Sequence, residues 1–463
     1  MKKFLAVTIG ILAAAYYMYN FLNIKPPLPP IHDTIWKDED GTIDNEIYPF
    51  SINVTKKNLE YLKRRLRDSV YAPPLKGVNF TYGFNTDHLQ KIVNYWLNDY
   101  NWNEREKLLN AVPQFRTRIS GLNIHFIHLK PHANVLKQKR VLPLLLLHGW
   151  PGSVKEFYKV LPLLVSPQSE YDFVFEVVVP SLPGYGFSEA ATKPGLDTAH
   201  IALIMKKLMN RIGFTKFYVQ GGDWGSIIGT DMITFYPESV NGFHSNLCIP
   251  PISSLSMIKM VIGSFFPEFM TSSSFKYRLY PFREIFAFLA EETGYLHVQA
   301  TKPDTIGVAL LDSPVGLAAY ILEKFSTWEN YNRRDSPDGG LSLEKLNEKN
   351  YCIDDLLDNV MIYWLTGSIT SSMRLYKESV MSTMLRGSPM PTLVPTACAQ
   401  YPFEIMHHLE SIIREKFRNL VYLSHMPQGG HFPAFEEPKL FVSDVRKAIC
   451  TILNFVENAK QIC

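Results

Sequence analysis

The stretch Val219-Gln220-Gly221-Gly222-Asp223-Trp224-Gly225-Ser226 decides the fold of this chain. A strand-like apolar run at residues 216–219 leads into it, and an apolar run with helix-like spacing leads out from Ile227. Glycines stand two positions before and two positions after Asp223, which lets the backbone turn sharply and project that one side chain outward. The stretch predicts a strand-to-helix turn with Asp223 at its tip.

An aspartate at the tip changes the chemistry of this turn, because the G-x-S-x-G version carries a serine there. A carboxylate is already ionised at neutral pH, so it needs no general base to become a nucleophile. It can attack an sp³ carbon that bears a strained or good leaving group and form an ester on the enzyme. The alternative is an ordinary loop, since Gly and Asp are common turn residues, and the rest of the chain has to decide.

Buried strands and helices alternate around this turn. Residues 141–147 are a continuous apolar run typical of a strand buried on both faces, residues 175–179 predict another buried strand, and a helix is expected at about residues 198–212. The alternation predicts right-handed crossovers and a mostly parallel sheet, with functional residues at the carboxyl ends of its strands. The alternation of strands and helices stops at about residue 250 and is absent to about residue 390, which predicts a helical lid. Strand-like runs occur again at residues 392–397 and 419–423.

The amino-terminal part is expected to differ from this core. Thr55 can cap a helix, and residues 115–119 and 123–127 predict a hairpin, with His125 on an exposed or half-buried face. The expected organisation is a membrane anchor, a Pro-rich linker, an amino-terminal helical and hairpin region, a first part of the core, a helical lid and a second part of the core. Their ranges are 1–24, 25–44, 45–140, 141–250, 251–390 and 391–463.

The anchor prediction rests on residues 4–24, which carry no charge and are mostly apolar. As a helix they would be ~30 Å long, enough to cross a bilayer core. A cleavable signal peptide is the alternative, whereas a buried core helix is disfavoured because a proline-rich run follows. Lys2 and Lys3 before the segment and acidic residues after it favour a lumenal body, but the bias is weak and the side stays open.

Composition narrows the function classes. The chain has 463 residues, of which 46% are hydrophobic and 20% charged, in the range of a globular protein with a sizeable core. The net charge is +3 with no long basic run, so nothing points to nucleic acid. The five cysteines are scattered, which predicts neither a disulfide framework nor a zinc site.

Asp223, Glu404 and His431 follow the nucleophile–acid–histidine chain order of the α/β-hydrolases. Beside an aspartate nucleophile, the histidine would activate the water that hydrolyses the ester. Glu404, after a late strand, would accept the other imidazole N–H and stabilise the imidazolium.

Four motifs together look like the microsomal epoxide hydrolase family, and within it most like the insect juvenile hormone epoxide hydrolases. They are His148-Gly149-Trp150-Pro151-Gly152, Gly184-Tyr185-Gly186-Phe187-Ser188, Gly222-Asp223-Trp224-Gly225-Ser226 and Gly429-Gly430-His431-Phe432. The resemblance implies an α/β-hydrolase fold at the endoplasmic reticulum membrane. It also implies hydrolysis of lipophilic epoxides, juvenile hormone or xenobiotic, to vicinal diols, with water as co-substrate and no cofactor or metal.

The resemblance also implies residue roles. The backbone N–H groups of Trp150 and Trp224 would form the oxyanion hole for ester hydrolysis. Tyr295 and Tyr376, in the lid, would donate hydrogen bonds to the epoxide oxygen. A haloalkane dehalogenase-like hydrolase is the alternative enzyme, with halide-binding groups in place of the two phenols. A catalytically silent hydrolase fold serving as a membrane-tethered binding protein is the alternative of another class.

Overall fold

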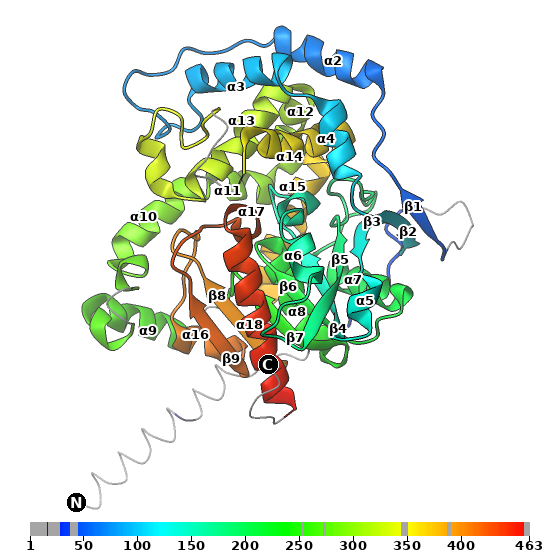
Figure 1. Cartoon of the computed structure of the whole chain (residues 1–463). Helices are drawn as coiled ribbons and strands as arrows, with labels where there is room; N and C mark the ends of the chain where they lie inside the picture. Colours follow the sequence, from blue (N-terminus) through cyan, green and yellow to red (C-terminus); the bar gives the residue numbers. More distant parts are fainter. Residues whose placement is uncertain are drawn as a thin grey trace, which may run out of the picture.

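The computed structural model describes residues 16, 28–37, 45–251, 253–271, 275–343, 351–386 and 390–457. Within these residues nine strands form one sheet, in the order β1-β2-β3-β5-β4-β6-β7-β8-β9 (Figure 1). The strands from β5 to β9 in that order pair in parallel, and β1, β2 and β3 extend the sheet beyond β5 with each neighbouring pair antiparallel. The bounds are β1 Ile47–Phe50, β2 Gln114–Ile119, β3 Leu122–Leu129, β4 Arg140–Leu147, β5 Phe173–Pro180, β6 Phe217–Gly221, β7 Val240–Ser245, β8 Thr396–Gln400 and β9 Leu420–His425.

Strand β4 shows why the apolar runs form the centre of the sheet. Its last four residues are all leucines with no exposed surface, and successive side chains point to opposite faces. Leu144 and Leu146 pack against the layer that contains α6 (Leu161–Val165) and α18 (Pro438–Val456). Leu145 and Leu147 pack against the layer that contains α7 (Thr198–Ile212) and α8 (Trp224–Phe235). Helices therefore cover both faces, which is the arrangement that a parallel sheet requires.

The segment between β7 and β8 is helical, as predicted; most of it lies over the carboxyl ends of the parallel strands, and its first helix lies at the side of the sheet next to residues 410–416 (Figure 1). Its helices are α9 Ser254–Phe265, α10 Phe282–Glu292, α11 Gly294–Thr301, α12 Pro303–Asp312, α13 Pro314–Thr327, α14 Ile353–Thr366 and α15 Ile369–Arg386, with the short 3₁₀ turns η3 Pro267–Phe269, η4 Lys276–Arg278 and η5 Tyr331–Asp335. We call this segment the lid. The other short elements are α5 Ala133–Leu136, η1 Val154–Phe157, η2 Pro237–Ser239, α16 Glu410–Lys416 and α17 Pro433–Glu436.

The amino-terminal helices α2 (Lys56–Arg67), α3 (Thr86–Asn98) and α4 (Trp102–Leu109) lie on the outer side of the lid (Figure 1). Thr55 caps α2 as predicted, because its side chain accepts from the Asn58 N–H. A buried charge cluster ties this layer to the lid: Arg105 of α4 contacts Asp355 and Asp358 of α14 at 2.7 and 2.6 Å. The amino-terminal region thus holds one lid helix in place.

Three features differ from the sequence predictions. Cys248 and Cys398 form a disulfide, although their separation of 150 residues gave no pattern to read. Strands β1 and β7 were missed, the second because its sequence Val-Asn-Gly-Phe-His-Ser has little apolar character. His125 is fully buried, where its ring bonds Ser181 Oγ and Gln114 Oε1, and burial lowers the pKa of His125 to about 3.

The predicted membrane anchor at residues 1–24 lies outside the described residues except for Tyr16. Across the residues that are described, no single helix has the length and apolar composition to cross a bilayer. The pair α12 and α13 meets both criteria only when taken together, and it bends by 116° at Ser313.

Candidate active site

Asp223 lies at the turn between β6 and α8, where the sequence predicted it. Its backbone φ of 49° falls in the left-handed region, which is uncommon for a residue with a side chain. The neighbouring glycines make this turn possible: a Cβ at Gly221 would lie 2.3 Å from the carbonyl oxygen of Gly225, and one at Gly225 would lie 2.1 Å from that of Leu147. The strain is local to the residue that the chemistry needs, which is characteristic of a functional turn.

The carboxylate of Asp223 is held by two groups. The backbone N–H of Trp150, in the loop after β4, donates to Oδ1 at 2.8 Å. On the other side His431 Nε2 lies 3.3 Å from Oδ2. Gly149 leaves the room for this contact, because a Cβ there would lie 2.1 Å from Oδ1. Trp224, the second predicted N–H donor, is the first residue of α8, next to Asp223.

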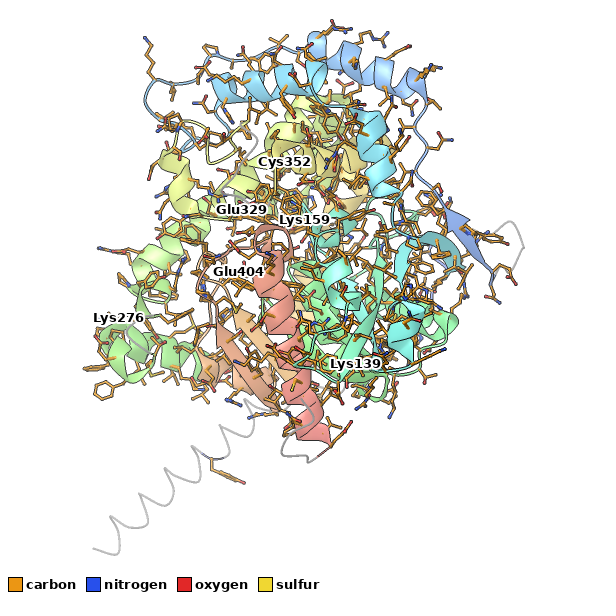
Figure 2. All side chains as sticks on the ribbon, in the orientation of Figure 1. Lys139, Lys159, Lys276, Glu329, Cys352 and Glu404 are labelled. Carbon is orange, nitrogen blue, oxygen red and sulfur yellow. A yellow bond between two sulfur atoms is a disulfide. The ribbon has the colours of Figure 1, made fainter. Side chains whose placement is uncertain are left out.

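His431 and Glu404 meet as predicted. Nδ1 of His431 lies 2.6 Å from Glu404 Oε1, and both side chains are buried. Glu404, labelled in Figure 2, follows β8 below the lid helices. Burial by itself would lower the pKa of His431, but Glu404 and Asp223 together raise it well above its usual range. The two carboxylates on either side of the ring thus favour the protonated form of His431.

The two predicted tyrosines reach this site from different lid helices. Tyr295 of α11 stacks on the Trp150 indole with ring centroids 5.1 Å apart, and Tyr376 of α15 meets the Trp224 indole edge-on at 4.7 Å. Their own rings lie 5.7 Å apart. Burial, and then the charge of Asp223 among other neighbours, raises the pKa of both phenols well above 10. Both remain protonated at neutral pH and can donate a hydrogen bond.

Two residues near His431 were not singled out from the sequence. The carbonyl oxygen of Trp328, at the end of α13, accepts from the His431 N–H at 3.0 Å, and its ring lies 4.9 Å from the imidazole. Glu436 is the second of these residues. Its carboxylate accepts from the N–H groups of Gly430 and Phe432 at 2.9 and 2.8 Å, and so fixes the backbone on both sides of His431.

Helix α14 of the lid grips the loop that carries Trp150. Asn359 Nδ2 donates to the Pro151 carbonyl at 2.8 Å and its Oδ1 accepts from Ser153 Oγ at 2.7 Å. The Tyr363 hydroxyl donates to the Gly152 carbonyl at 2.8 Å. These bonds hold the three residues that follow Trp150, whose backbone N–H donates to Asp223. The lid and the core together therefore define the position of that N–H.

Comparison with known proteins finds similar sequences and structures over most of the chain. Residues 47–157 match the family model described as epoxide hydrolase N terminus, and residues 143–438 match alpha/beta hydrolase fold. Juvenile hormone epoxide hydrolase 1 of Ctenocephalides felis is 51% identical over 451 residues, 97% of this chain and 95% of that protein. Epoxide hydrolase 1 of Oryctolagus cuniculus is 43% identical over 438 residues, 92% of this chain and 94% of that one. The crystal structure of juvenile hormone epoxide hydrolase from Bombyx mori superposes with a TM-score of 0.87 at 43% identity, covering 92% of this chain and 99% of that one.

Proposed function

Because the chain belongs to the microsomal epoxide hydrolase family, we propose that it hydrolyses lipophilic epoxides to vicinal diols through an ester on Asp223. The observation that carries this proposal is the position of the Asp223 carboxylate, with Oδ1 bound by the Trp150 N–H and Oδ2 beside His431. One oxygen is already held as a carbonyl oxygen would be in the ester. The other lies beside His431 and supplies the lone pair that forms the bond to carbon.

In the first step, Asp223 Oδ2 attacks one epoxide carbon and the C–O bond of the strained ring breaks. The electron pair goes to the epoxide oxygen, which becomes an alkoxide and takes a proton from Tyr295 or Tyr376. An alkoxide is a poor leaving group, so a donor must be in place as its charge develops. The aromatic walls around the two phenols, formed by Trp150, Trp224 and Trp328, suit a lipophilic substrate.

In the second step, esterification has removed the negative charge of Asp223, which was one of the two carboxylates that raise the pKa of His431. The imidazolium proton can then return to the phenolate left by the first step, so that the neutral imidazole accepts a proton from water through Nε2 while Glu404 stabilises the charge that returns to the ring. Water oxygen attacks the ester carbon, and Trp150 N–H and the helix amide of Trp224 would stabilise the oxyanion. Collapse breaks the acyl C–O bond and releases the diol.

For the substrate, we infer a terpenoid epoxide such as juvenile hormone, the substrate named in two similar proteins. The alternative of dehalogenation is disfavoured by the two lid phenols, because a halide leaves without protonation. The alternative of a silent binding protein is disfavoured because Asp223, His431 and Glu404 lie within reach of one another.

The test is a single turnover in ¹⁸O-labelled water with enzyme in excess over a lipophilic epoxide. We expect the first diol to be unlabelled, because its new oxygen comes from Asp223, and the label to appear in the Asp223 carboxylate. A labelled first diol would mean that water attacks the epoxide directly. If no epoxide is turned over, the result would favour the dehalogenase and binding-protein alternatives.

We also propose that the protein associates with the endoplasmic reticulum membrane, through residues 4–24 and through a second contact on the lid. Large apolar side chains protrude from α9, η3, η4 and α10, with Phe269 86% and Phe265 75% exposed. We call these residues the apolar lid surface: Leu255, Met257, Ile258, Val261, Ile262, Phe265, Phe266, Phe269, Tyr277, Phe282 and Phe286. The exposed Lys276 and Arg283 lie in the same stretch of chain, and apolar side chains together with basic ones suit the headgroup region of a bilayer.

A spin label tests the lid contact in the full chain on phosphatidylcholine vesicles. A nitroxide at Phe269→Cys, in a Cys352→Ala background, should be relaxed by oxygen and shielded from a water-soluble nickel chelate. The matched control is Val70→Cys, which is 95% exposed and follows α2, at a different end of the molecule from α9 (Figure 1). Equal access of nickel to both sites would overturn the lipid contact, and spin–spin broadening would indicate a second copy of the chain instead.

A further inference from the structure

A small polar cavity lies behind the Asp223 carboxylate. It is lined by the polar side chains of Asp223, His431, Gln220 of β6, Glu156 of η1 and Asn246, together with apolar side chains. The space open to the centre of a water molecule is about 10 Å³, a size at which a polar cavity holds one ordered water. The cavity therefore has the dimensions and the chemistry of a site for a single water molecule.

Two buried polar atoms at this cavity have no hydrogen-bond partner. His431 Nε2 approaches Asp223 but forms no hydrogen bond with it, and Gln220 Oε1 is unpaired although the Nε2 of the same amide donates to Asn246 Oδ1 at 2.9 Å. Buried polar atoms are normally satisfied, by protein or by water. A water in the cavity would satisfy both.

The carboxyl of Glu156 reaches the cavity because residue 152 is a glycine. A Cβ at Gly152 would lie 1.5 Å from Glu156 Oε1, so any other residue there would displace the carboxyl. Lys155, next to Glu156, is buried and pairs with Asp355 and Asp358 of α14 at 2.9 and 2.7 Å, which anchors η1. The anchored backbone of η1 and the space beside Gly152 together fix the position of the Glu156 carboxyl.

The charge state of Glu156 suits a water ligand. Burial raises the pKa of its carboxyl to about 8, the negative charge of Asp223 adds to the shift, and His431 and the Ser153 N–H oppose it. A neutral carboxyl has both a hydrogen-bond donor and an acceptor. It also adds no third negative charge beside Asp223 and Glu404.

We propose that this cavity binds the water that hydrolyses the ester, and that Glu156 is the positioning residue that holds it. The inference rests on the proposed function. The water would donate one hydrogen to His431 Nε2 and the other to an oxygen of Glu156 or Gln220, which leaves a lone pair for the Asp223 carbonyl carbon. In the reaction the first hydrogen passes to Nε2 as the O–C bond forms. The acyl C–O bond then breaks, and the departing alkoxide takes that proton.

The experiment separates the two steps in the full-length protein with an aryl epoxide in single-turnover kinetics. Acid quenching and mass analysis of the Asp223 peptide follow formation and loss of the ester. In Glu156→Leu we expect loss of the ester to slow about 10- to 100-fold, while its formation changes little, because only the second step uses the water. The ester should therefore accumulate. Glu156→Gln, which keeps a donor and an acceptor, should restore hydrolysis.

Gly152→Ala is the second variant, because it leaves Glu156 in the chain and displaces its carboxyl. It should show the same accumulation, and it keeps the test open if Glu156→Leu does not fold. Unchanged ester hydrolysis in both, or equal slowing of both steps, would overturn the positioning role, as would a Gln variant as slow as Leu. Absence of any trapped ester in the wild type and in His431→Gln would instead refute the proposed function itself.

Discussion

The disulfide between Cys248 and Cys398 allows the most quantitative prediction. Cys248 lies shortly after β7 and Cys398 within β8, so the bond joins the two strands between which the lid is inserted. It closes a loop of 150 residues that contains the whole lid. In the chain-entropy description, closing a loop of this length removes ~17 cal/mol/K from the unfolded state, or about 5 kcal/mol at 25 °C.

The perturbation is the double variant Cys248→Ala/Cys398→Ala. The entropy of unfolding is about 2.1 cal/mol/K per residue, which gives about 1 kcal/mol/K for a chain of 463 residues. Dividing the lost stability by this entropy gives an expected fall in Tm of about 5 °C. Scanning calorimetry of the full chain measures it. Reduced wild type should lose at least as much Tm as the double variant, because reduction also opens the disulfide of Cys450.

Cys352→Ala is the matched control, since Cys352 is the free cysteine among the described residues and lies outside this bond. We expect it to shift Tm by less than 1 °C. A double variant that also shifts Tm by less than 1 °C would refute the reasoning. So would a reductant that leaves the wild-type Tm unchanged after the thiols have been titrated.

Three further predictions concern the site and its support. Tyr376→Phe should lower kcat/KM about 10- to 100-fold in steady-state assays, because one hydrogen bond to the alkoxide is lost. Tyr82 is exposed, so the control variant Tyr82→Phe should keep the wild-type kcat/KM. Because the pKa of Tyr376 is raised well above 10, the rate of ester formation should not fall between pH 7 and about pH 9; a fall would contradict the assignment. His431→Gln should form the ester and fail to hydrolyse it, as mass analysis after acid quenching would show. Lys155→Met should lower the free energy of unfolding, measured in urea, by about 3–5 kcal/mol, because it leaves the buried carboxylates with one cation fewer. Lys130 is exposed, so Lys130→Met should lower it by less than about 1 kcal/mol. The lowered pKa of Asp355 means that its wild-type contribution is present above the ordinary aspartate pKa, about 3.9, and is lost as the pH falls below it.

The turn at Asp223 was predictable because its cause is local. Only glycine fits at 221 and 225, and that requirement is visible in eight consecutive residues. The parallel core followed from the same kind of signal, since β4 ends in four leucines and β5 is apolar except for Glu176. Strand β7 carries no such run, and its place between β6 and β8 depends on pairing with residues far away in the sequence.

The site residues were predictable where a motif surrounds them, and not where only tertiary contacts define them. Glu404 and His431 follow late strands in a known chain order, and the structure brings them together with Asp223. Tyr295 and Tyr376 came only from family resemblance, because a tyrosine in an aromatic lid has no local mark. Glu156 was missed because its significance depends on the space beside Gly152. The cysteine pair was missed because 150 residues separate its members.

The grip of α14 on the loop after β4 limits how the active site can open. Asn359 and Tyr363 hold the carbonyls of Pro151 and Gly152, next to the Trp150 N–H that binds Asp223. If the lid swung away as one rigid body, these bonds would break and the catalytic constellation would come apart with every substrate admitted. We therefore expect α14 to stay with the sheet throughout the cycle and to act as part of the floor. The passage for substrate and diol must then lie among lid helices without such ties, so admission and catalysis belong to separate parts of the lid.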